Sequence, residues 1–311
     1  MEATVPFPVV DFHVHPKRPP EKMVDDFQAA GVIKAVILAT DTYREDIDRE
    51  DVQQHVAATY RHSDISREMS FDFLIQEIRD SLCSDSHIGN QDVIRLQRER
   101  PDMFIGFGSV DLCRGDLYAE NTLSMIKEAG LHGVKLLPYS QFFNPEESET
   151  AELLMDFCGR NGLIVLTHSG CSSGVFESPY LSMHCRPAKW QKLALSHKDV
   201  PLVLAHFGAY SAMYPGIWLE EAIDLMASCE NVYADTAAVW RMLQNEVIVS
   251  LIRKRIGFDR VLFGTDYPMP TLAPGGEQGV VLEILNNSYL TTEEKYAILG
   301  GNALSLLQKS V

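Results

Sequence analysis

Basic residues are few in this 311-residue chain. It carries 27 Lys and Arg against 43 Asp and Glu, which gives a formal net charge of −16 and an isoelectric point near 5.0. Binding to nucleic acid or to an anionic membrane needs clustered Lys and Arg, so the composition argues against both partners. We therefore expect a small-molecule partner.

Long apolar runs, paired cysteines and nucleotide-binding glycine motifs are also missing. No apolar run approaches the ~18–20 residues of a membrane span, and no segment resembles a signal peptide. The six cysteines are scattered without a Cys-x-x-Cys pair, so free thiols in a cytoplasmic protein are expected. No G-x-G-x-x-G or G-x-x-x-x-G-K stretch opens an expected helix, which weakens the case for a doubly wound nucleotide-binding sheet.

Short apolar, β-branched runs recur along the chain and alternate with segments of helical periodicity, a pattern typical of repeated βα units. The expected strands are 9–15, 35–40, 104–110, 133–138, 163–168, 202–206, 232–237 and 261–266. Eight strands over about 300 residues favour a closed (β/α)8 TIM barrel, with an open doubly wound sheet as the competitor. We expect one domain over 1–311.

Residues 41–91 form a long, charged insertion after the second strand. Apolar residues at helical spacing in 71–82 predict an amphipathic helix there. A connection of this length must carry structure of its own, so a helical elaboration or lid is expected. A solvated surface excursion is at least as good an interpretation as a role in substrate binding. The Pro- and Gly-rich stretch 269–279 is expected to be a loop beside the pocket.

The first strand carries Asp11-Phe12-His13-Val14-His15. Side chains alternate along a strand, so Asp11, His13 and His15 share one face. Two imidazoles at i and i+2, roughly 7 Å apart at Cα, can reach one metal ion. Taken alone, this motif has about even odds of being an ordinary strand end. Asp11 lies deeper and favours an anchoring role.

Three later strands end in metal-competent side chains, namely His168, His206 and Asp266. Parallel strands of a barrel end at one mouth, where barrel active sites lie. Imidazoles with a carboxylate suit Zn²⁺ and other first-row divalent ions, which would activate water at neutral pH. Asp266 could then act as general base and general acid, while His206 ligates or hydrogen-bonds the water and the oxyanion.

These motifs together resemble the amidohydrolase superfamily, and most closely its amidohydrolase-2, or aminocarboxymuconate-semialdehyde-decarboxylase-like, branch. They occur in the order of the family from Asp11 to Pro268. The resemblance implies a distorted (β/α)8 barrel, a divalent metal usually taken as zinc, and hydrolysis of amide or ester bonds, with decarboxylation in some members. It implies one metal on His13, His15, His168 and Asp266, with His206 acting on the water.

Lys135 complicates the metal count. Its stretch Gly133-Val134-Lys135-Leu136-Leu137-Pro138 resembles the strand of dihydroorotases in which a carboxylated lysine bridges two metals. Burying an ammonium without a partner is costly, so Lys135 needs a role. One metal is favoured, with Lys135 donating to Asp266 or to an anion of the substrate. A bridged pair of metals is the alternative.

The favoured function is a metal-dependent hydrolase of a small organic substrate. A non-oxidative decarboxylase of an aromatic or unsaturated acid is the alternative, and Arg186 or Arg241 in the pocket would favour it by clamping a substrate carboxylate. For both arginines, surface solvation is an equally good interpretation. A catalytically silent metal-binding barrel is a further alternative, against which the complete ligand set argues. Analogy with barrel enzymes suggests a homodimer.

Overall fold

The protein is described from a computed structural model, which covers residues 5–82, 88–269 and 274–309. In these residues eight parallel strands pair in the order of the sequence. They are β1 (Val9–Val14), β2 (Val32–Leu38), β3 (Phe104–Ser109), β4 (Gly133–Leu136), β5 (Ile164–Thr167), β6 (Leu202–Leu204), β7 (Val232–Asp235) and β8 (Val261–Leu262).

The end of the sheet returns to its beginning. The Phe12 amide donates to the Phe263 carbonyl at 2.8 Å, and the His15 amide donates to the Tyr267 carbonyl at 3.0 Å. An open doubly wound sheet would leave its two outermost strands apart, so these bonds exclude that competitor. The fold is a TIM barrel, as the alternation of strands and helices predicts.

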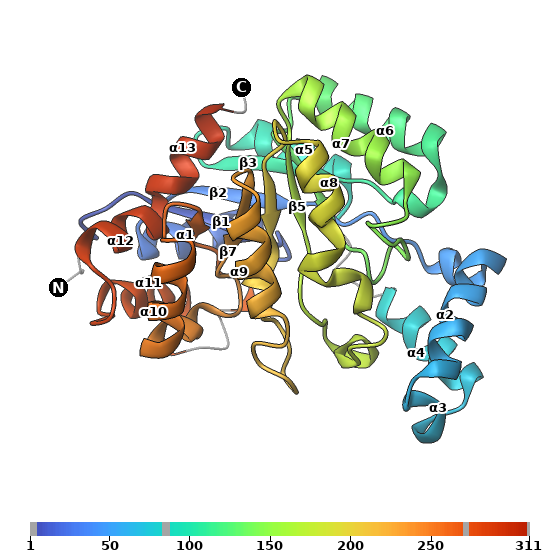
Figure 1. Ribbon diagram of the computed structural model, residues 1–311. Coiled ribbons are helices and arrows are strands. Elements are labelled where there is room, and N and C mark those ends of the chain that lie inside the picture. Colours follow the sequence, from blue (N-terminus) through green and yellow to red (C-terminus); the bar gives the residue numbers. More distant parts are fainter. Residues whose placement is uncertain (1–4, 83–87, 270–273, 310–311) are drawn as a thin grey trace.

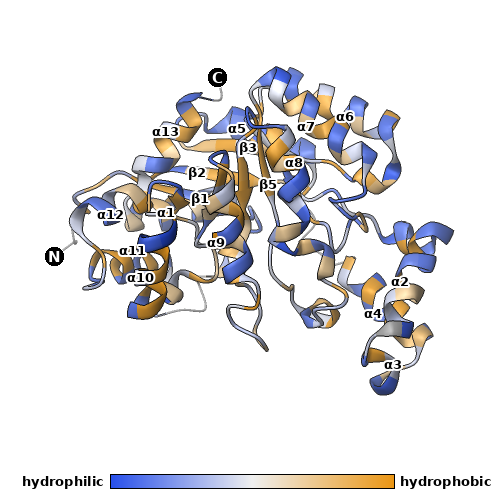
Figure 2. Ribbon diagram, viewed as in Figure 1, coloured by the Kyte–Doolittle hydropathy of each residue, from blue (hydrophilic) through white to orange (hydrophobic). Residues whose placement is uncertain are grey.

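Helices lie outside the strands (Figure 1). They are α1 (Pro20–Ala30), α5 (Asn90–Glu99), α6 (Asp116–Glu128), α7 (Glu149–Asn161), α8 (Gln191–Ser196), α9 (Leu219–Ser228), α10 (Glu246–Arg255), α11 (Gly276–Leu285), α12 (Thr292–Tyr296) and α13 (Asn302–Lys309). Figure 2 shows apolar strands at the centre and polar outward faces on the helices. Among the described residues, no helix is both long enough and apolar enough to cross a membrane.

The core has an inner part within the barrel. Phe12 of β1 packs edge-on against Phe107 of β3, with ring centroids 5.8 Å apart. Leu166, Leu262 and Leu306 of α13 belong to the same buried cluster. This filled interior leaves the polar side chains at the strand ends to form the site.

The insertion after β2 is helical, as predicted. It comprises η1 (Arg44–Asp48), α2 (Glu50–His62), α3 (Ile65–Glu68) and α4 (Phe71–Leu82), while 83–87 lie outside the described residues. In Figure 1, α2, α3 and α4 lie to one side of the barrel. They have their own apolar cluster, in which Leu74 and Ile78 of α4 join Phe142 and Phe176 from the connections after β4 and β5. The insertion is therefore docked on the loops that follow the barrel strands.

One helix departs from the sequence prediction. Stretch 269–279 reads as loop because of its glycines and prolines, yet α11 begins at Gly276. Gly275, with φ of 81°, forms the left-handed turn that precedes the helix. Val280, Val281 and Ile284 are fully buried in the core. Their burial outweighs the poor helix propensity of the first turn.

Candidate active site

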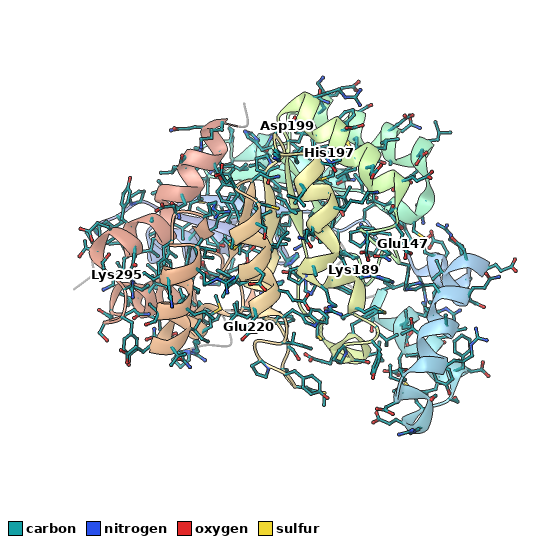
Figure 3. The ribbon with its side chains drawn as sticks, in the orientation of Figure 1. Glu147, Lys189, His197, Asp199, Glu220 and Lys295 are labelled. Carbon is teal, nitrogen blue, oxygen red and sulfur yellow. The ribbon has the colours of Figure 1, made fainter. Side chains whose placement is uncertain are left out.

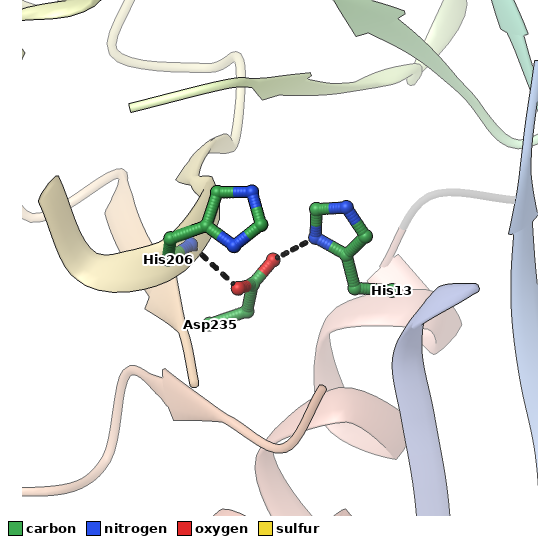
Figure 4. A group of neighbouring side chains, drawn as sticks. All are labelled: His13, His206 and Asp235. Carbon is green, nitrogen blue, oxygen red and sulfur yellow. Dashed lines mark hydrogen bonds and ion pairs between the residues drawn. The ribbon is translucent and has the colours of Figure 1, made fainter. Parts of the chain in front are cut away.

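Asp235, at the end of β7, holds two of the histidines. Its Oδ2 accepts a hydrogen bond from His13 Nδ1 at 2.9 Å, and its Oδ1 accepts one from the His206 amide at 2.8 Å (Figure 4). A second amide, that of Ala237, donates to the same Oδ1 at 3.0 Å. Both oxygens of Asp235 are thus used to position residues of the site.

These contacts also fix the protonation of each imidazole. A carboxylate oxygen only accepts hydrogen bonds, so His13 carries its proton on Nδ1 and keeps a lone pair on Nε2. The Nδ1 of His206 donates to the Ala237 carbonyl at 2.9 Å, which leaves a lone pair on its Nε2 as well. The Nε2 of His168 donates to the Cys171 carbonyl at 2.7 Å, which leaves the lone pair on Nδ1. A second partner that orients an imidazole in this way is typical of metal-binding histidines.

His13, His15 and Asp266 bring three donor atoms together. The two Nε2 atoms lie 3.3 Å apart, and Oδ1 of Asp266 lies 3.3 Å from His15 Nε2 and 3.6 Å from His13 Nε2. Ligands of a tetrahedral zinc ion at about 2.0–2.1 Å are separated by about 3.3–3.4 Å. The spacing of these atoms therefore fits one divalent ion.

His168 and His206 complete the ring of imidazoles. The His206 ring centroid lies 4.8 Å from that of His13 and 4.8 Å from that of His168. All the histidines predicted for the site therefore meet at the mouth of the barrel. The role of His168 as a metal ligand stays a prediction, because its Nδ1 is not part of the closely spaced donor groups among the described residues.

The electrostatics keep this site in a metal-competent form. Burial lowers the pKa of His13 and of His168 well below 6.5 and lowers that of His206 to about 4, so these imidazoles are neutral at neutral pH. Burial opposes ionisation of Asp266, but its hydrogen bond with His15 and the neighbouring imidazoles hold its pKa well below 3.8. Neutral imidazoles and an ionised carboxylate are the forms that bind a metal.

The backbone is strained at two site residues. His206 has φ of 59° and Asp266 has φ of 62°, the left-handed region that non-glycine residues seldom adopt. Such conformations cost about 1–3 kcal/mol each and tend to cluster at functional sites. Both residues line the cavity at the mouth of the barrel.

Lys135 reaches the same donor group. It is fully buried, and its Nζ lies 3.2 Å from His13 Nε2. Burial lowers the pKa of Lys135 to about 8, against the opposing charges of Asp235 and Asp266. With this pKa the amine is mostly protonated at neutral pH but loses its proton more readily than an ordinary lysine, which suits both a donor and a carboxylated bridge, so both interpretations of Lys135 remain predictions.

The two arginines lie elsewhere. Arg186 Nε donates to Glu221 Oε1 of α9 at 3.1 Å, and Arg241 Nη2 donates to Glu283 Oε1 of α11 at 3.1 Å. Neither is among the described residues that line the cavity at the mouth. The structure therefore favours the surface interpretation of both arginines over a clamp on a substrate carboxylate, because each guanidinium pairs with a helix carboxylate.

Three other described histidines, His55, His184 and His197, do not line the cavity at the mouth of the barrel. His197, at the end of α8 (Figure 3), places Nδ1 3.0 Å from the Leu193 carbonyl, an ordinary helix-end contact. His55 of α2 meets His184 of η4 (Met183–Cys185) with their Nε2 atoms 3.1 Å apart. That contact helps to attach the insertion to the barrel.

A cavity of about 490 Å³ opens at the mouth, a size that suits a small organic ligand. Metal-competent side chains line it together with hydroxyl groups and part of the insertion. The lining residues include His15, Lys17, Lys135, Tyr139, Ser140, His168, Ser172, His206, Tyr210 and Asp266, with Ser81 and Leu82 from α4.

Asp235 is the site residue that the sequence analysis missed. A signal was present, because the apolar run Val-Tyr-Ala-Asp of β7 ends in a carboxylate just as β5 is followed by a histidine.

Changing Asp235 to asparagine removes the charge that faces His13 Nδ1 and places an amide where an acceptor is needed. We expect metal affinity to fall about 10–100-fold. Titration with Zn²⁺ against a competing chelator measures it, and an unchanged affinity would contradict the role given to Asp235.

A buried carboxyl pair lies behind the site. Asp11 accepts hydrogen bonds from the His13 amide at 3.0 Å and the Thr265 amide at 3.1 Å, which ties β1 to the end of β8. Glu277 of α11 is buried against it. Burial raises the pKa of Asp11 to about 6, and burial together with the Asp11 charge raises the pKa of Glu277 well above 4.5.

This pair makes stability depend on pH. Between the ordinary and the raised pKa values, the folded state keeps protons that the unfolded state has lost. The contribution of this pair to the free energy of unfolding is therefore fully present below the ordinary carboxyl pKa and is lost as pH rises toward the raised values. We expect the free energy of unfolding to fall as pH rises from about 4 toward the raised pKa of Asp11, about 6, by up to about 1.4 kcal/mol per unit for each retained proton. The Glu277→Gln variant should show a shallower slope in urea unfolding at stepped pH, with Glu220→Gln as the surface control; identical slopes in all three proteins would contradict this prediction.

The comparisons with known proteins agree with this geometry. The fold and the donor atoms define a TIM-barrel protein with an imidazole and carboxylate site at its mouth. A model of the amidohydrolase family matches residues 10–309, so the chain belongs to that family. No curated protein sequence matches the chain.

Solved structures resemble the chain in fold. An uncharacterized TIM-barrel protein from Bordetella bronchiseptica has a TM-score of 0.64 at 17% identity, over 97% of this chain and 99% of its own. A 2,6-dihydroxybenzoate decarboxylase from Rhizobium has a TM-score of 0.58 at 13% identity, over 97% and 99%. A probable 2-pyrone-4,6-dicarboxylic acid hydrolase from Acinetobacter baumannii, with citric acid bound, has a TM-score of 0.59 at 13% identity, over 96% and 99%. At these identities the likeness shows the fold alone.

Proposed function

We propose that the protein is a metal-dependent hydrolase of a small organic substrate, acting on an amide, lactone or ester bond. One observation carries this proposal: a neutral imidazole, His206, and an ionised carboxylate, Asp266, line one cavity from strained backbone positions. These two proton acceptors lie at the same site as the closely spaced donor atoms of His13 and His15, and Asp266 belongs to both sets.

His13, His15 and Asp266 would hold the metal, with His168 as the further predicted ligand and Zn²⁺ as the expected ion. A bound divalent ion would supply Lewis-acid polarisation of the scissile carbonyl and lower the pKa of water. Asp235 and the Ala237 carbonyl keep the lone pairs of His13 and His206 available for this site.

The acid and base work falls to His206 and Asp266. His206 Nε2 can only accept a hydrogen bond, so it orients a water molecule by taking one of its O–H groups. Asp266 accepts a proton from the water molecule as the water oxygen attacks the carbonyl carbon. Asp266 then gives that proton to the leaving nitrogen or oxygen as the scissile bond breaks. Water is thereby divided between the two products.

Decarboxylation is the second candidate, because a cation that the sequence analysis did not single out, Lys17, lines the cavity. In that reaction the bond from carbon to carboxylate breaks, carbon dioxide leaves, and a proton from solvent takes its place on carbon. The same histidines and Asp266 would hold the carboxylated substrate.

One experiment separates the two reactions. Zn²⁺-loaded protein is incubated with lactones, amides, esters and aromatic acids in water enriched in ¹⁸O and, separately, in D₂O. Hydrolysis places ¹⁸O in the new carboxylate and requires the metal, whereas decarboxylation places deuterium on carbon and releases carbon dioxide. Metal-dependent ¹⁸O incorporation supports the proposal. Deuterium incorporation alone favours the second candidate, and no metal-dependent turnover on any of these compounds counts against both. The expectations of a cytoplasmic homodimer and of a single domain stay predictions.

A further inference from the structure

Lys17 lies on a short, stiff connection. Only 15–19 separate β1 from α1, and Pro16, Pro19 and Pro20 restrict this stretch. The Lys17 amide donates to the His15 carbonyl at 2.7 Å, which tightens the turn immediately after the His-x-His pair. The backbone at Lys17 is therefore held beside a predicted metal ligand. Binding of a ligand to Lys17 then costs only the ordering of its side chain.

The side chain of Lys17 lines the cavity at the mouth of the barrel. Lys17 is exposed to solvent there, and the predicted metal ligands His15 and Asp266 line the same cavity. The other lysine of the cavity, Lys135, is buried deeper and contacts His13.

Lys17 differs from Arg186 and Arg114 in having no carboxylate partner among the described residues. In the described part of the chain no ion pair joins it to Asp or Glu, whereas Arg186 pairs with Glu221 and Arg114 pairs with Asp46. An ammonium that lines a cavity, is exposed to solvent and has no counterion is available to an anion supplied by a ligand.

Hydroxyl groups complete the polar lining. Tyr139, Ser140, Ser172 and Tyr210 line the same cavity. A tyrosine hydroxyl keeps its proton at neutral pH, so each tyrosine offers a hydrogen-bond donor to the cavity. One ammonium and several hydroxyl donors match a carboxylate better than a phosphate dianion, for which several basic groups are usual.

We propose that Lys17 binds a carboxylate of the substrate that is separate from the bond being broken, so that the substrate of this cavity is an organic acid. This inference rests on the proposed function for the location of the reacting bond. It assigns to Lys17 the part that the sequence analysis gave to Arg186 or Arg241, and it fits a carboxylated lactone or amide as well as a dicarboxylic acid.

The test is a binding experiment on Zn²⁺-loaded protein with two probes, benzoate and isophthalate. Isophthalate carries a second carboxylate on the same ring. Titration calorimetry is carried out on the wild type, Lys17→Met, Lys17→Arg and the surface control Lys295→Met, whose position is labelled in Figure 3. Metal content is measured in each protein, so a lost metal cannot pass for a lost anion site.

We expect the wild type to bind isophthalate about tenfold more tightly than benzoate, because one charge-assisted contact is added. Lys17→Met should remove this preference and leave benzoate affinity within about twofold, and Lys17→Arg should restore most of it. Raising the salt concentration should shrink the preference in the wild type.

Three results would overturn the inference: no preference for isophthalate in the wild type, an unchanged preference in Lys17→Met, or equal weakening of both probes in that variant. Binding is read without turnover, so its outcome is separate from that of the hydrolysis assay. A preference for isophthalate that depends on Lys17 would support the carboxylate site even if no hydrolysis were found. Hydrolysis of uncharged substrates alone would overturn the organic-acid assignment and leave the hydrolase proposal intact.

Discussion

Replacing Asp266 by asparagine is expected to lower kcat by about 10³-fold or more. Loss of a general base typically costs 10²–10⁴-fold, and the same change removes an anionic donor that lies 3.3 Å from His15 Nε2. The proton transfers occur as bonds form and break, so kcat should fall much more than KM rises. Steady-state kinetics at saturating Zn²⁺ on the substrate found in the hydrolysis assay measure both constants.

The control for Asp266 is an exposed carboxylate of equal size. Asp199 lies on the outer surface, between α8 and β6 (Figure 3). The Asp199→Asn variant should leave kcat and KM unchanged. The Asp266→Asn protein is compared at several Zn²⁺ concentrations. If excess metal restores activity to within about tenfold of the wild type, Asp266 acts only as a ligand and the proton shuttle assigned to it is wrong.

Much of the site follows from the sequence because of the topology of the barrel. Parallel strands joined by helices all end at one mouth, so a residue type repeated at strand ends becomes a cluster in space. His13, His15, His168, His206 and Asp266 were each predicted from such a position, and the structure brings them together. The eight strands were predicted from their apolar runs in the same way, with differences at their ends, such as the start of β2 at Val32.

The loops are harder to predict because their course depends on tertiary contacts. Arg186 lies 19 residues after the end of β5, too far for the strand to fix its position, and its side chain pairs with Glu221 on α9. Lys17 gave no periodic signal, and its place depends on the stiff turn after His15. Asp235 resembled an ordinary strand end, because a single acid gives no spacing that would indicate its partners His13 and His206.

The number of metal ions depends on Lys135. Its Nζ lies 3.2 Å from His13 Nε2, close to the donors of the first ion. An ammonium at this point would donate to a substrate or to Asp266, whereas a carboxylated amine would add two oxygen ligands and bridge a second ion. Two groups of closely spaced donor atoms occur among the described residues, His13 with His15 and Asp266 and His13 with His206 and Asp235. They share His13, and Asp235 already accepts the hydrogen bond of its Nδ1, so we expect about one equivalent of Zn²⁺ per chain in the wild type.

Three proteins decide the count. His13→Ala removes a shared donor and should lose the metal almost completely on gel filtration. Lys135→Met keeps the length and apolar stem of the side chain and should retain about one equivalent, with unchanged or higher stability, because a buried charge is removed without leaving a large cavity. Metal analysis and urea unfolding measure the two properties. The bridged pair would be established if the wild type bound two equivalents, if both were lost in Lys135→Met, and if bicarbonate restored them in the wild type but not in the variant. That result would shift the expected substrates toward cyclic amides.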